Sequence, residues 1–275
     1  MSSSVSPLFV LALAACNQVF GLAQTVEHDG GQYDAPLDAP FSCPPIGGPP
    51  PRFAPLLHQI VVQDCLSYSI TSGGRAIALC VFNGSYHVAE GPRDEPLIEI
   101  PEIVGSPTTT LLTPRLSPGG DMIVVNSAGV QSSILVYSRI GGSWQPLANA
   151  PFVTTTAAFL STFERGPTGD RLFVVTIAAL EEWAYEGSTW RKLLTESVQE
   201  LGVDTNTLQV ATDGLRAIVP TTSSLYFTDR PDQAAKFRPA VPINDIPAFQ
   251  DVFMTDDCAR LYFTGLGSIF YMQHE

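Results

Sequence analysis

Basic residues and histidines are scarce in this chain. Its 275 residues include 14 Lys and Arg against 27 Asp and Glu, and only four His. No Lys/Arg cluster is present that could replace the counterions of a nucleic acid, which excludes a nucleic-acid partner. The formal net charge of −13 keeps the protein soluble and disfavours docking on an anionic membrane by charge.

Long apolar runs and enzyme signatures are also missing. No stretch reaches the roughly 18 residues that a membrane-spanning helix requires. The chain has no G-x-S-x-G, S-x-x-K or H-E-x-x-H motif and no calcium-loop spacing of Asp. His28 lies in a Pro/Gly-rich segment, His274 is next to the C-terminus, and His58 and His87 read as ordinary strand residues. The sequence therefore predicts no catalytic residues, no metal site and no cofactor.

The N-terminal apolar run "PLFVLALAAC" ends at Cys16. Its length suits the hydrophobic region of an export signal; the alternative is an apolar strand or helix of the folded domain. The letters "LAAC" resemble the bacterial lipobox, although the preceding "MSSSVSP" lacks the usual Lys or Arg. The resemblance implies that residues 1–16 are a lipoprotein signal, that Cys16 carries the lipid, and that Asn17 directs sorting to the outer membrane.

Residues 17–52 have a different composition, rich in Pro and Gly. The stretch "EHDGGQYDAPLDAPFSCPPIGGPPPR" shows no helical or strand periodicity. Such a segment is typical of a disordered, semi-extended tether. A lipid anchor followed by a tether would hold a domain away from a membrane surface.

Beyond the tether, one unit recurs five times. The copies are "ITSGGRAIALC", "LSPGGDMIVVN", "RGPTGDRLFVV", "VATDGLRAIVP" and "MTDDCARLYFT", with Gly74, Gly120, Gly169, Gly214 and Cys258 as equivalent positions. Their spacings are 46, 49, 45 and 44 residues. Each copy reads as apolar strand, turn, apolar strand, turn, third strand. A repeat of this length made of short antiparallel strands is typical of a propeller blade.

A fourth, outer strand follows in the complete units. It is marked by Trp144, Trp190 and Phe237, and more weakly by "EPLIEI" in the first unit. The fifth unit has no room for one, but Phe53 in "RFAPLLHQIVV" stands in the same aromatic position. We therefore predict an all-β fold over residues 53–275: five four-stranded blades, the last completed by the N-terminal residues 53–62. Six blades are the alternative.

The turn pattern, close to "SPDGxxLxF", resembles the WD40-like, TolB-type (PD40) propeller repeats of bacterial exported proteins. Several copies depart from the pattern; for example, "SPGGD" lacks the Asp before Gly, and Cys258 replaces a Gly in the last copy. The resemblance covers residues 53–275 and implies a cell-envelope propeller.

Four polar residues are expected on the innermost strands, which line the axis of a propeller: Arg115, Glu164, Gln209 and Asp251. They could form a small-ligand or peptide site in the channel. The alternative is a hydrated channel with an Arg–Glu ion pair. The recurring aromatics could likewise stack on sugars, but their single repeat position favours packing between blades.

These features lead to a functional hypothesis. The protein is expected to be exported, monomeric and lipid-anchored to the outer membrane, and to act as a non-enzymatic binding or scaffold module for protein or other envelope partners. The alternative is a propeller enzyme of lyase or glycosidase type that uses Glu164 and Asp251.

Four cysteines remain after Cys16, and an even number in an oxidising compartment permits three pairings. In the first hairpin, with its turn centred in "TSGG", residues whose numbers sum to 145 should oppose each other, which pairs Cys65 with Cys80. Cys43 and Cys258 would then form the second disulfide. The alternative is that Cys65 and Cys80 stay reduced as small buried apolar residues.

Overall fold

The computed structural model describes residues 43–275 apart from short internal stretches. Those left out are 56, 62–63, 72, 105–108, 130–132, 148–157, 167–168, 177–178, 187–188, 204–207, 212, 222, 248–250 and 266–267. The expectations for the signal, for Cys16 and for most of the tether therefore fall outside the described residues.

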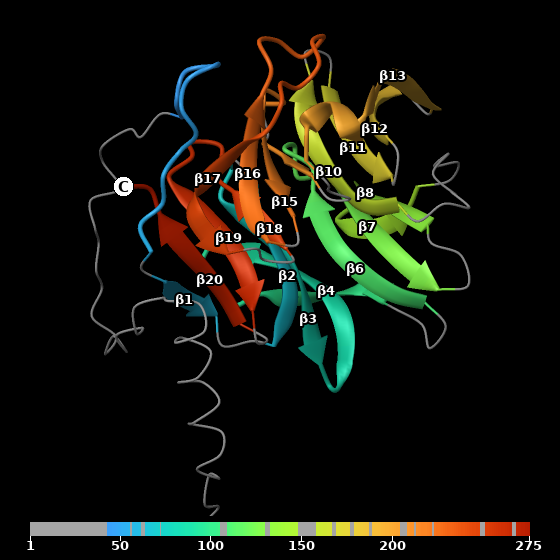
Figure 1. Ribbon diagram of the computed structural model, residues 1–275. Helices are drawn as coiled ribbons and strands as arrows, with labels where there is room; N and C mark the ends of the chain where they lie inside the picture. Colours follow the sequence, from blue (N-terminus) through green and yellow to red (C-terminus); the bar gives the residue numbers. More distant parts are fainter. Residues whose placement is uncertain are drawn as a thin grey trace, which may run out of the picture.

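The described residues form five four-stranded antiparallel sheets, numbered here as blades 1 to 5 (Figure 1). Blade 1 comprises β2 Cys65–Ile70, β3 Arg75–Phe82, β4 Ser85–Pro92 and β5 Ile98–Val104. Blade 2 comprises β6 Thr109–Leu116, β7 Met122–Gly129, β8 Ser133–Ile140 and β9 Ser143–Pro146. Blade 3 comprises β10 Ala158–Gly166, β11 Gly169–Thr176, β12 Ala179–Glu186 and β13 Thr189–Ser197.

Blade 4 comprises β14 Gln209–Val210, β15 Arg216–Pro220, β16 Ser224–Asp229 and β17 Val241–Pro247, and the short 3-10 turn η1 Val198–Leu201 precedes it. Blade 5 comprises β18 Val252–Met254, β19 Arg260–Gly265, β20 Ser268–Gln273 and β1 His58–Val61. The first strands of neighbouring blades contact one another all round, β2 with β6, β6 with β10, β10 with β14, β14 with β18 and β18 with β2. The five-bladed propeller predicted from the repeats is confirmed. Among the described residues no helix is long and apolar enough to cross a membrane.

The turn after each first strand explains the recurring glycine. In blade 1 the Gly74 N–H donates to the Thr71 carbonyl at 2.9 Å, and Gly74 has a φ of +74°, where a Cβ would be strained. Blade 5 keeps the same bond, from Cys258 to Thr255 at 2.8 Å, and Cys258 adopts a φ of +58°. The last copy therefore preserves the turn geometry although it has lost the glycine.

The N-terminal residues close the ring as the sequence predicts. Strand β1 lies antiparallel to β20, and an isolated bridge joins Phe53 to His274 (Figure 1). The Ala54 N–H donates to the Gln273 carbonyl at 2.8 Å. The edge of the terminal strand is thus covered, which removes a row of unpaired backbone groups.

Both expected disulfides are present, Cys65–Cys80 and Cys43–Cys258. The hairpin register behind the first prediction is off by one over most of its length, because Tyr68 pairs with Ala78 and Ile70 with Ala76. A register shift between Cys65 and Ser67 brings the two cysteines opposite each other. The second disulfide ties the start of the described chain to the turn of blade 5.

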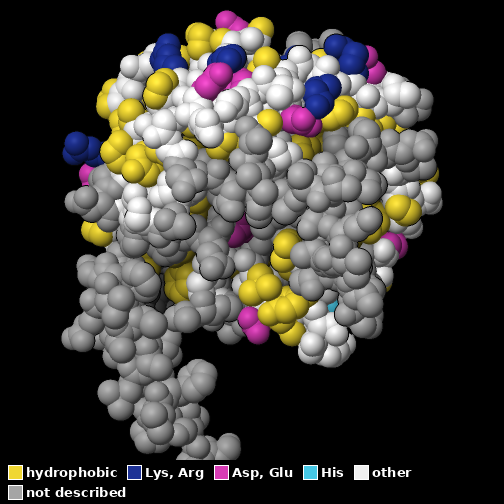
Figure 2. Space-filling view, turned by 45° about the vertical axis from the view of Figure 1, so that its right-hand side comes forward, with side chains coloured by type: hydrophobic (Ala, Val, Ile, Leu, Met, Phe, Trp, Pro, Cys, Tyr) yellow, Lys and Arg dark blue, Asp and Glu magenta, His cyan; other side chains and the backbone are white. Residues whose placement is uncertain are grey.

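The core lies between the blades. Three of the repeated aromatics are buried in it, Phe53 at 0%, Trp144 at 4% and Phe237 at 4% exposure. The fourth, Trp190, is half-buried against Tyr185, with ring centroids 5.0 Å apart. These positions confirm a packing role for the recurring aromatic. On the face shown in Figure 2, Lys/Arg and Asp/Glu side chains lie interspersed rather than in separate fields.

Candidate functional site at the centre of the ring

The four polar candidates come from four different inner strands. Arg115 is on β6, Glu164 on β10, Gln209 begins β14, and Asp251 immediately precedes β18. The side chain of Glu164 lies outside the described part of the structure. The backbone of Glu164 in β10 pairs with that of Arg171 in β11. The structure brings two of the four together.

Arg115 and Asp251 form a buried ion pair that reaches from blade 2 to blade 5. Their side chains are 2% and 6% exposed. The Asp251 carboxylate also accepts a hydrogen bond from the Tyr68 backbone N–H at 3.2 Å, and Arg115 donates to the Pro114 carbonyl at 2.9 Å. Among the described side chains the channel ion pair is Arg115–Asp251, whereas the sequence suggested an Arg–Glu pair. A buried charge pair needs such additional hydrogen bonds to offset the cost of removing both ions from water.

Three buried polar groups on the inner strands have no hydrogen-bond partner among the described residues. They are the Ser67 hydroxyl, the Arg115 Nε and the Gln209 Nε2. The other end of the Gln209 amide is used, since its Oε1 accepts from the Met254 N–H at 3.0 Å. Unsatisfied buried groups are rare in folded proteins and indicate an ordered water, a ligand or a catalytic role. All three of these groups can donate.

The backbone next to Arg115 is unusual. Thr113 has a φ of +29°, and the register of β6 against β7 shifts between Leu112 and Arg115. The Thr113 hydroxyl accepts a hydrogen bond from the Asn126 side-chain amide at 2.8 Å. A β-branched residue at positive φ is strained, and bulges that re-aim a side chain are common beside active sites. The bulge sets the direction in which Arg115 leaves its strand.

A cavity of about 160 Å³ lies at one end of this group of residues. Its lining includes Ile70, which follows Ser69 at the end of β2, and Phe253, which lies in β18 two residues after Asp251. Arg93, Asp256 and Asp257 also line it. The volume is that of a few water molecules or a small polar ligand. This cavity, here called the mouth, lies between the turns of blades 1 and 5 and has a polar, charged lining.

Beside this mouth, a tyrosine-rich contact joins blades 5 and 1. Tyr68 OH accepts from the Asp94 N–H at 3.2 Å, and the Tyr262 OH donates to the Asp94 carboxylate at 3.2 Å. Burial raises the pKa of Tyr68 to about 12 and raises the pKa of Tyr262 as well, so both phenols stay neutral. Arg260 also binds Asp94, at 2.6 Å. This contact fixes the position of Tyr68, whose backbone holds Asp251.

The sequence pointed to Arg115, Gln209 and Asp251 through repeat alignment alone. It missed a second set of charged residues, Arg75, Glu90 and Arg139, which line a larger cleft between blades 1 and 2. Aligning arginines across the repeats could have found them, since Arg171 and Arg230 recur in matching places in blades 3 and 4. No three His, Cys, Asp or Glu side chains of the described residues gather in a way that would hold a metal ion.

No family model matches the chain, and no curated protein does. Among solved structures it is similar to a gluconolactonase from Xanthomonas campestris, at 10% identity and a TM-score of 0.47, over 82% of this chain and 91% of that one. It is also similar to the PQQ-bound aldose sugar dehydrogenase from Streptomyces coelicolor, at 10% identity and a TM-score of 0.41, over 83% and 100%.

The prediction of a non-enzymatic binding or scaffold module is wrong, because the propellers that the chain matches are enzymes. The alternative, a propeller enzyme, agrees better with them. Matches of this identity and TM-score concern the fold and assign neither a reaction nor a substrate. Both have to be sought in the chain's own residues.

Proposed function

We propose that this protein is a propeller enzyme that hydrolyses a small ester or lactone at the centre of its ring. The observation that carries the proposal is the set of unsatisfied buried donors, Ser67, Arg115 and Gln209, contributed by three blades. Donors held in a water-poor site stabilise negative charge that develops on a carbonyl oxygen. Arg115 is the principal group, because it is cationic and is locked in place by Asp251.

The carboxylates then have separate roles. Asp251 positions Arg115, and its ion pair makes it unsuitable as an acid or base of the glycosidase type. Glu164, on the next inner strand, is the candidate general base. In the proposed reaction Glu164 takes a proton from water as the water oxygen bonds to the carbonyl carbon. The resulting oxyanion is held by Arg115, and the proton passes to the departing alkoxide when the ester C–O bond breaks.

The test uses purified protein and a panel of small lactones and aryl esters, with acid release followed by a pH indicator. We expect Arg115→Lys, which keeps a cation beside Asp251, to lower kcat/KM by about 100-fold or more. Ser67→Ala should lower it less and leave the melting temperature unchanged, because the hydroxyl has no hydrogen-bond partner in the part of the chain that the structure describes. Hydrolysis that survives Arg115→Lys and Glu164→Gln undiminished would refute the proposal.

We further propose that the enzyme is exported and attached to the outer membrane through Cys16. The support is the lipobox-like "LAAC", the TolB-type turn pattern and two disulfides, which suit an oxidising compartment. Membrane attachment through the lipid and a monomeric state remain predictions, as does an envelope partner. Mass spectrometry of membrane-bound protein tests the anchor: a Cys16 without lipid would contradict it.

A further inference from the structure

A cleft of about 520 Å³ opens between blades 1 and 2, away from the central donors. Its charged and aromatic lining consists of Arg75, Glu90, Glu99, Glu102, Arg139 and Trp144. The volume falls within the range of roughly 300–1,000 Å³ that is usual for small-molecule sites.

An Arg–Glu–Arg cluster, here the open triad, forms one wall of this cleft. Glu90 binds Arg75 of its own blade and Arg139 of the next blade, the latter at 2.5 Å. The arginine side chains are 36% and 32% exposed, so both guanidinium groups reach solvent. Arg139 also lies over the indole ring of Trp144, 4.9 Å from its centroid.

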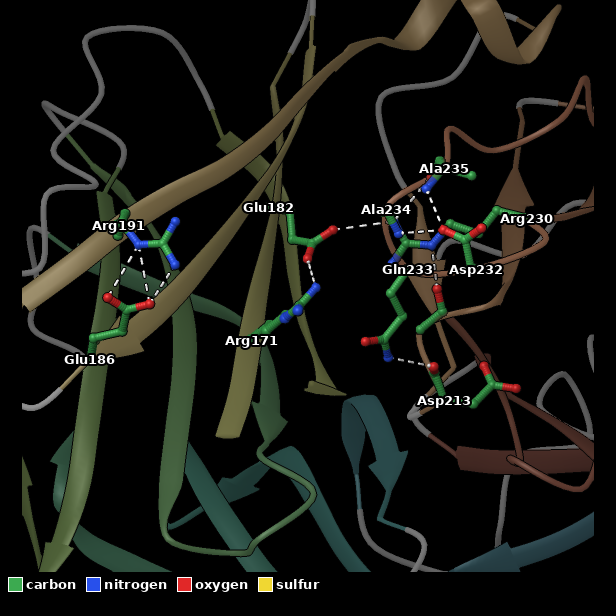
Figure 3. Close-up of polar contacts among 11 residues, drawn as sticks. Arg171, Glu182, Glu186, Arg191, Asp213, Arg230, Asp232, Gln233, Ala234 and Ala235 are labelled. Carbon is green, nitrogen blue, oxygen red and sulfur yellow. Dashed lines mark hydrogen bonds and ion pairs between the residues drawn. The ribbon is translucent and has the colours of Figure 1, made fainter. Parts of the chain in front are cut away.

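The same arrangement recurs between blades 3 and 4, as the buried triad of Arg171, Glu182 and Arg230 (Figure 3). In each triad the glutamate lies on the third strand, directly opposite the residue that follows the first arginine by two positions. That residue is Ile77 in blade 1 and Phe173 in blade 3. The second arginine comes from the end of the third strand of the next blade. Arg230 lies 4.8 Å over Phe237 as Arg139 lies over Trp144.

The two triads differ in how their donors are satisfied. The Arg230 Nε donates to the Gly214 carbonyl at 2.5 Å, and its side chain is 0% exposed. In the open triad the Arg139 Nε and the Trp144 Nε1 are buried and have no acceptor among the described residues. Phe237, at the place of Trp144, has no donor to satisfy. Compared with the buried triad, the open triad therefore lacks hydrogen-bond acceptors among the described residues for two donors, the Arg139 Nε and the Trp144 Nε1.

We propose that this cleft binds a neutral, polyhydroxylated ligand of mono- or disaccharide size. The ligand must accept hydrogen bonds from Arg139 and Trp144, and it also faces the carboxylate of Glu102, which can only accept when ionised. Hydroxyl groups both donate and accept, so they match both kinds of partner. Glu99 binds His87 at 2.7 Å on the opposite face of blade 1, which leaves two guanidinium groups against the carboxylates of Glu90 and Glu102. The cleft therefore has no net positive charge that would favour an anionic ligand.

This site is independent of the proposed reaction, and it can be tested on the full-length protein without an activity assay. The probes are D-glucose and maltose as neutral ligands and D-glucuronate and inorganic phosphate as anions, with binding followed by saturation-transfer NMR and calorimetry. We expect the neutral sugars to bind and the anions to bind more weakly or not at all.

Trp144→Phe is the decisive variant, because it installs the residue that the buried copy carries at this place. It removes the indole N–H and keeps a smaller aromatic ring under Arg139. It should weaken sugar binding by about five- to tenfold, the effect of one lost hydrogen bond. Arg139→Lys, which keeps the charge beside Glu90, should act in the same direction. Trp190→Phe, the same change on the outer strand of blade 3, is the matched control and should leave the affinity unchanged.

Each remaining outcome overturns the proposal. Glucuronate or phosphate binding more tightly than the neutral sugars would show that the charge argument is wrong. Sugar binding that both Trp144→Phe and Arg139→Lys leave intact would place the ligand elsewhere. A folded wild-type protein, with a melting temperature equal to that of the variants, that binds no sugar would also contradict the proposal. It would show that water alone satisfies the Arg139 Nε and the Trp144 Nε1.

Discussion

Blades 1 and 2 meet across the open triad, and blades 3 and 4 meet across the buried triad. Both triads place one carboxylate between two guanidinium groups from neighbouring blades. The glutamate side chain is 16% exposed in the open triad and 1% exposed in the buried one. The same charges therefore line a cleft at one interface and are largely covered at the other, where Glu182 and Arg230 are buried and Arg171 is 15% exposed.

The connection between the third and outer strands accounts for the difference. In blade 2, β8 and β9 are joined by only two residues, 141–142, and this connection is too short to fold back over Arg139. In blade 4, β16 and β17 are joined by residues 230–240, which fold back over Arg230 (Figure 3). The Gln233 side-chain amide fastens this segment to the Asp213 carbonyl at 2.9 Å, and the Ala235 carbonyl accepts from Arg230 at 3.5 Å. The repeat supplies the charges, and the length of one connection decides whether they are covered.

Removing the central carboxylate from each triad should give the largest difference between the two interfaces. We expect Glu182→Gln to lower the free energy of unfolding by about 3–5 kcal/mol, because it leaves a buried guanidinium without its counter-charge. Glu90→Gln should cost about 0–1 kcal/mol, since water can solvate both of its arginines. Urea unfolding of the two variants in parallel measures the difference, and equal losses would contradict the structural distinction.

A triple variant separates charge from packing. Replacing Arg171 and Arg230 with Met and Glu182 with Leu removes all three charges from the buried site while keeping side-chain volume. Its stability should return to that of the wild type or exceed it, because apolar residues of similar size often replace a buried ion cluster without loss. A triple variant as unstable as Glu182→Gln would show that the ions themselves stabilise this interface.

Much of the architecture could be predicted because it repeats. Five turns at near-constant spacing determined the number of blades, and the absence of an outer strand after Cys258 assigned the N-terminal residues to blade 5. The Cys65–Cys80 prediction was confirmed although its register was wrong, because a local bulge compensated for a one-residue error in the turn. Local irregularities of this kind have no period and leave no trace in a repeat alignment.

The candidate site was less predictable for the same reason. Inner-strand positions could be aligned, but the partner of Arg115 could not, because Asp251 is 136 residues away and reaches it across blade 1. The cleft between blades 1 and 2 stays open because the connection 141–142 is short. Sequence patterns report the residues that face an interface, whereas the space left there depends on tertiary packing.

A smaller effect is expected at Glu196, beside the buried triad. One of its oxygens accepts from the Phe237 N–H at 3.3 Å, and the other is buried without a partner among the described residues. Burial raises the pKa of Glu196, and the Phe237 hydrogen bond and Arg230 oppose this only in part. The folded protein therefore holds this proton more tightly than the unfolded chain. The contribution of Glu196 to stability is full below the unfolded pKa of about 4.5 and is lost as pH rises through the folded pKa.

Glu196→Gln should remove that pH dependence. The variant is expected to be more stable than the wild type near pH 8, and to differ little from it near pH 4, where both side chains are uncharged. Unfolding in urea at the two pH values measures the change. A variant less stable than the wild type at the higher pH would mean that the charged form of Glu196 contributes to the interface.

The smallest effect is expected at the pair Glu186–Arg191, which lies on the surface of blade 3 (Figure 3). Hydrogen bonds from Arg191 lower the pKa of Glu186, so the pair could stabilise folding only above the unfolded pKa of Glu, and less as pH falls. Both side chains are about half exposed, however, and solvent and salt screen their attraction. We therefore expect Glu186→Gln to leave the urea midpoint unchanged at neutral pH, at low and at high salt. If breaking this half-exposed pair costs as much stability as breaking Glu90–Arg139, exposure does not explain the weakness of the open triad. The shape of the cleft would then be what holds the charges of the open triad in place for the ligand.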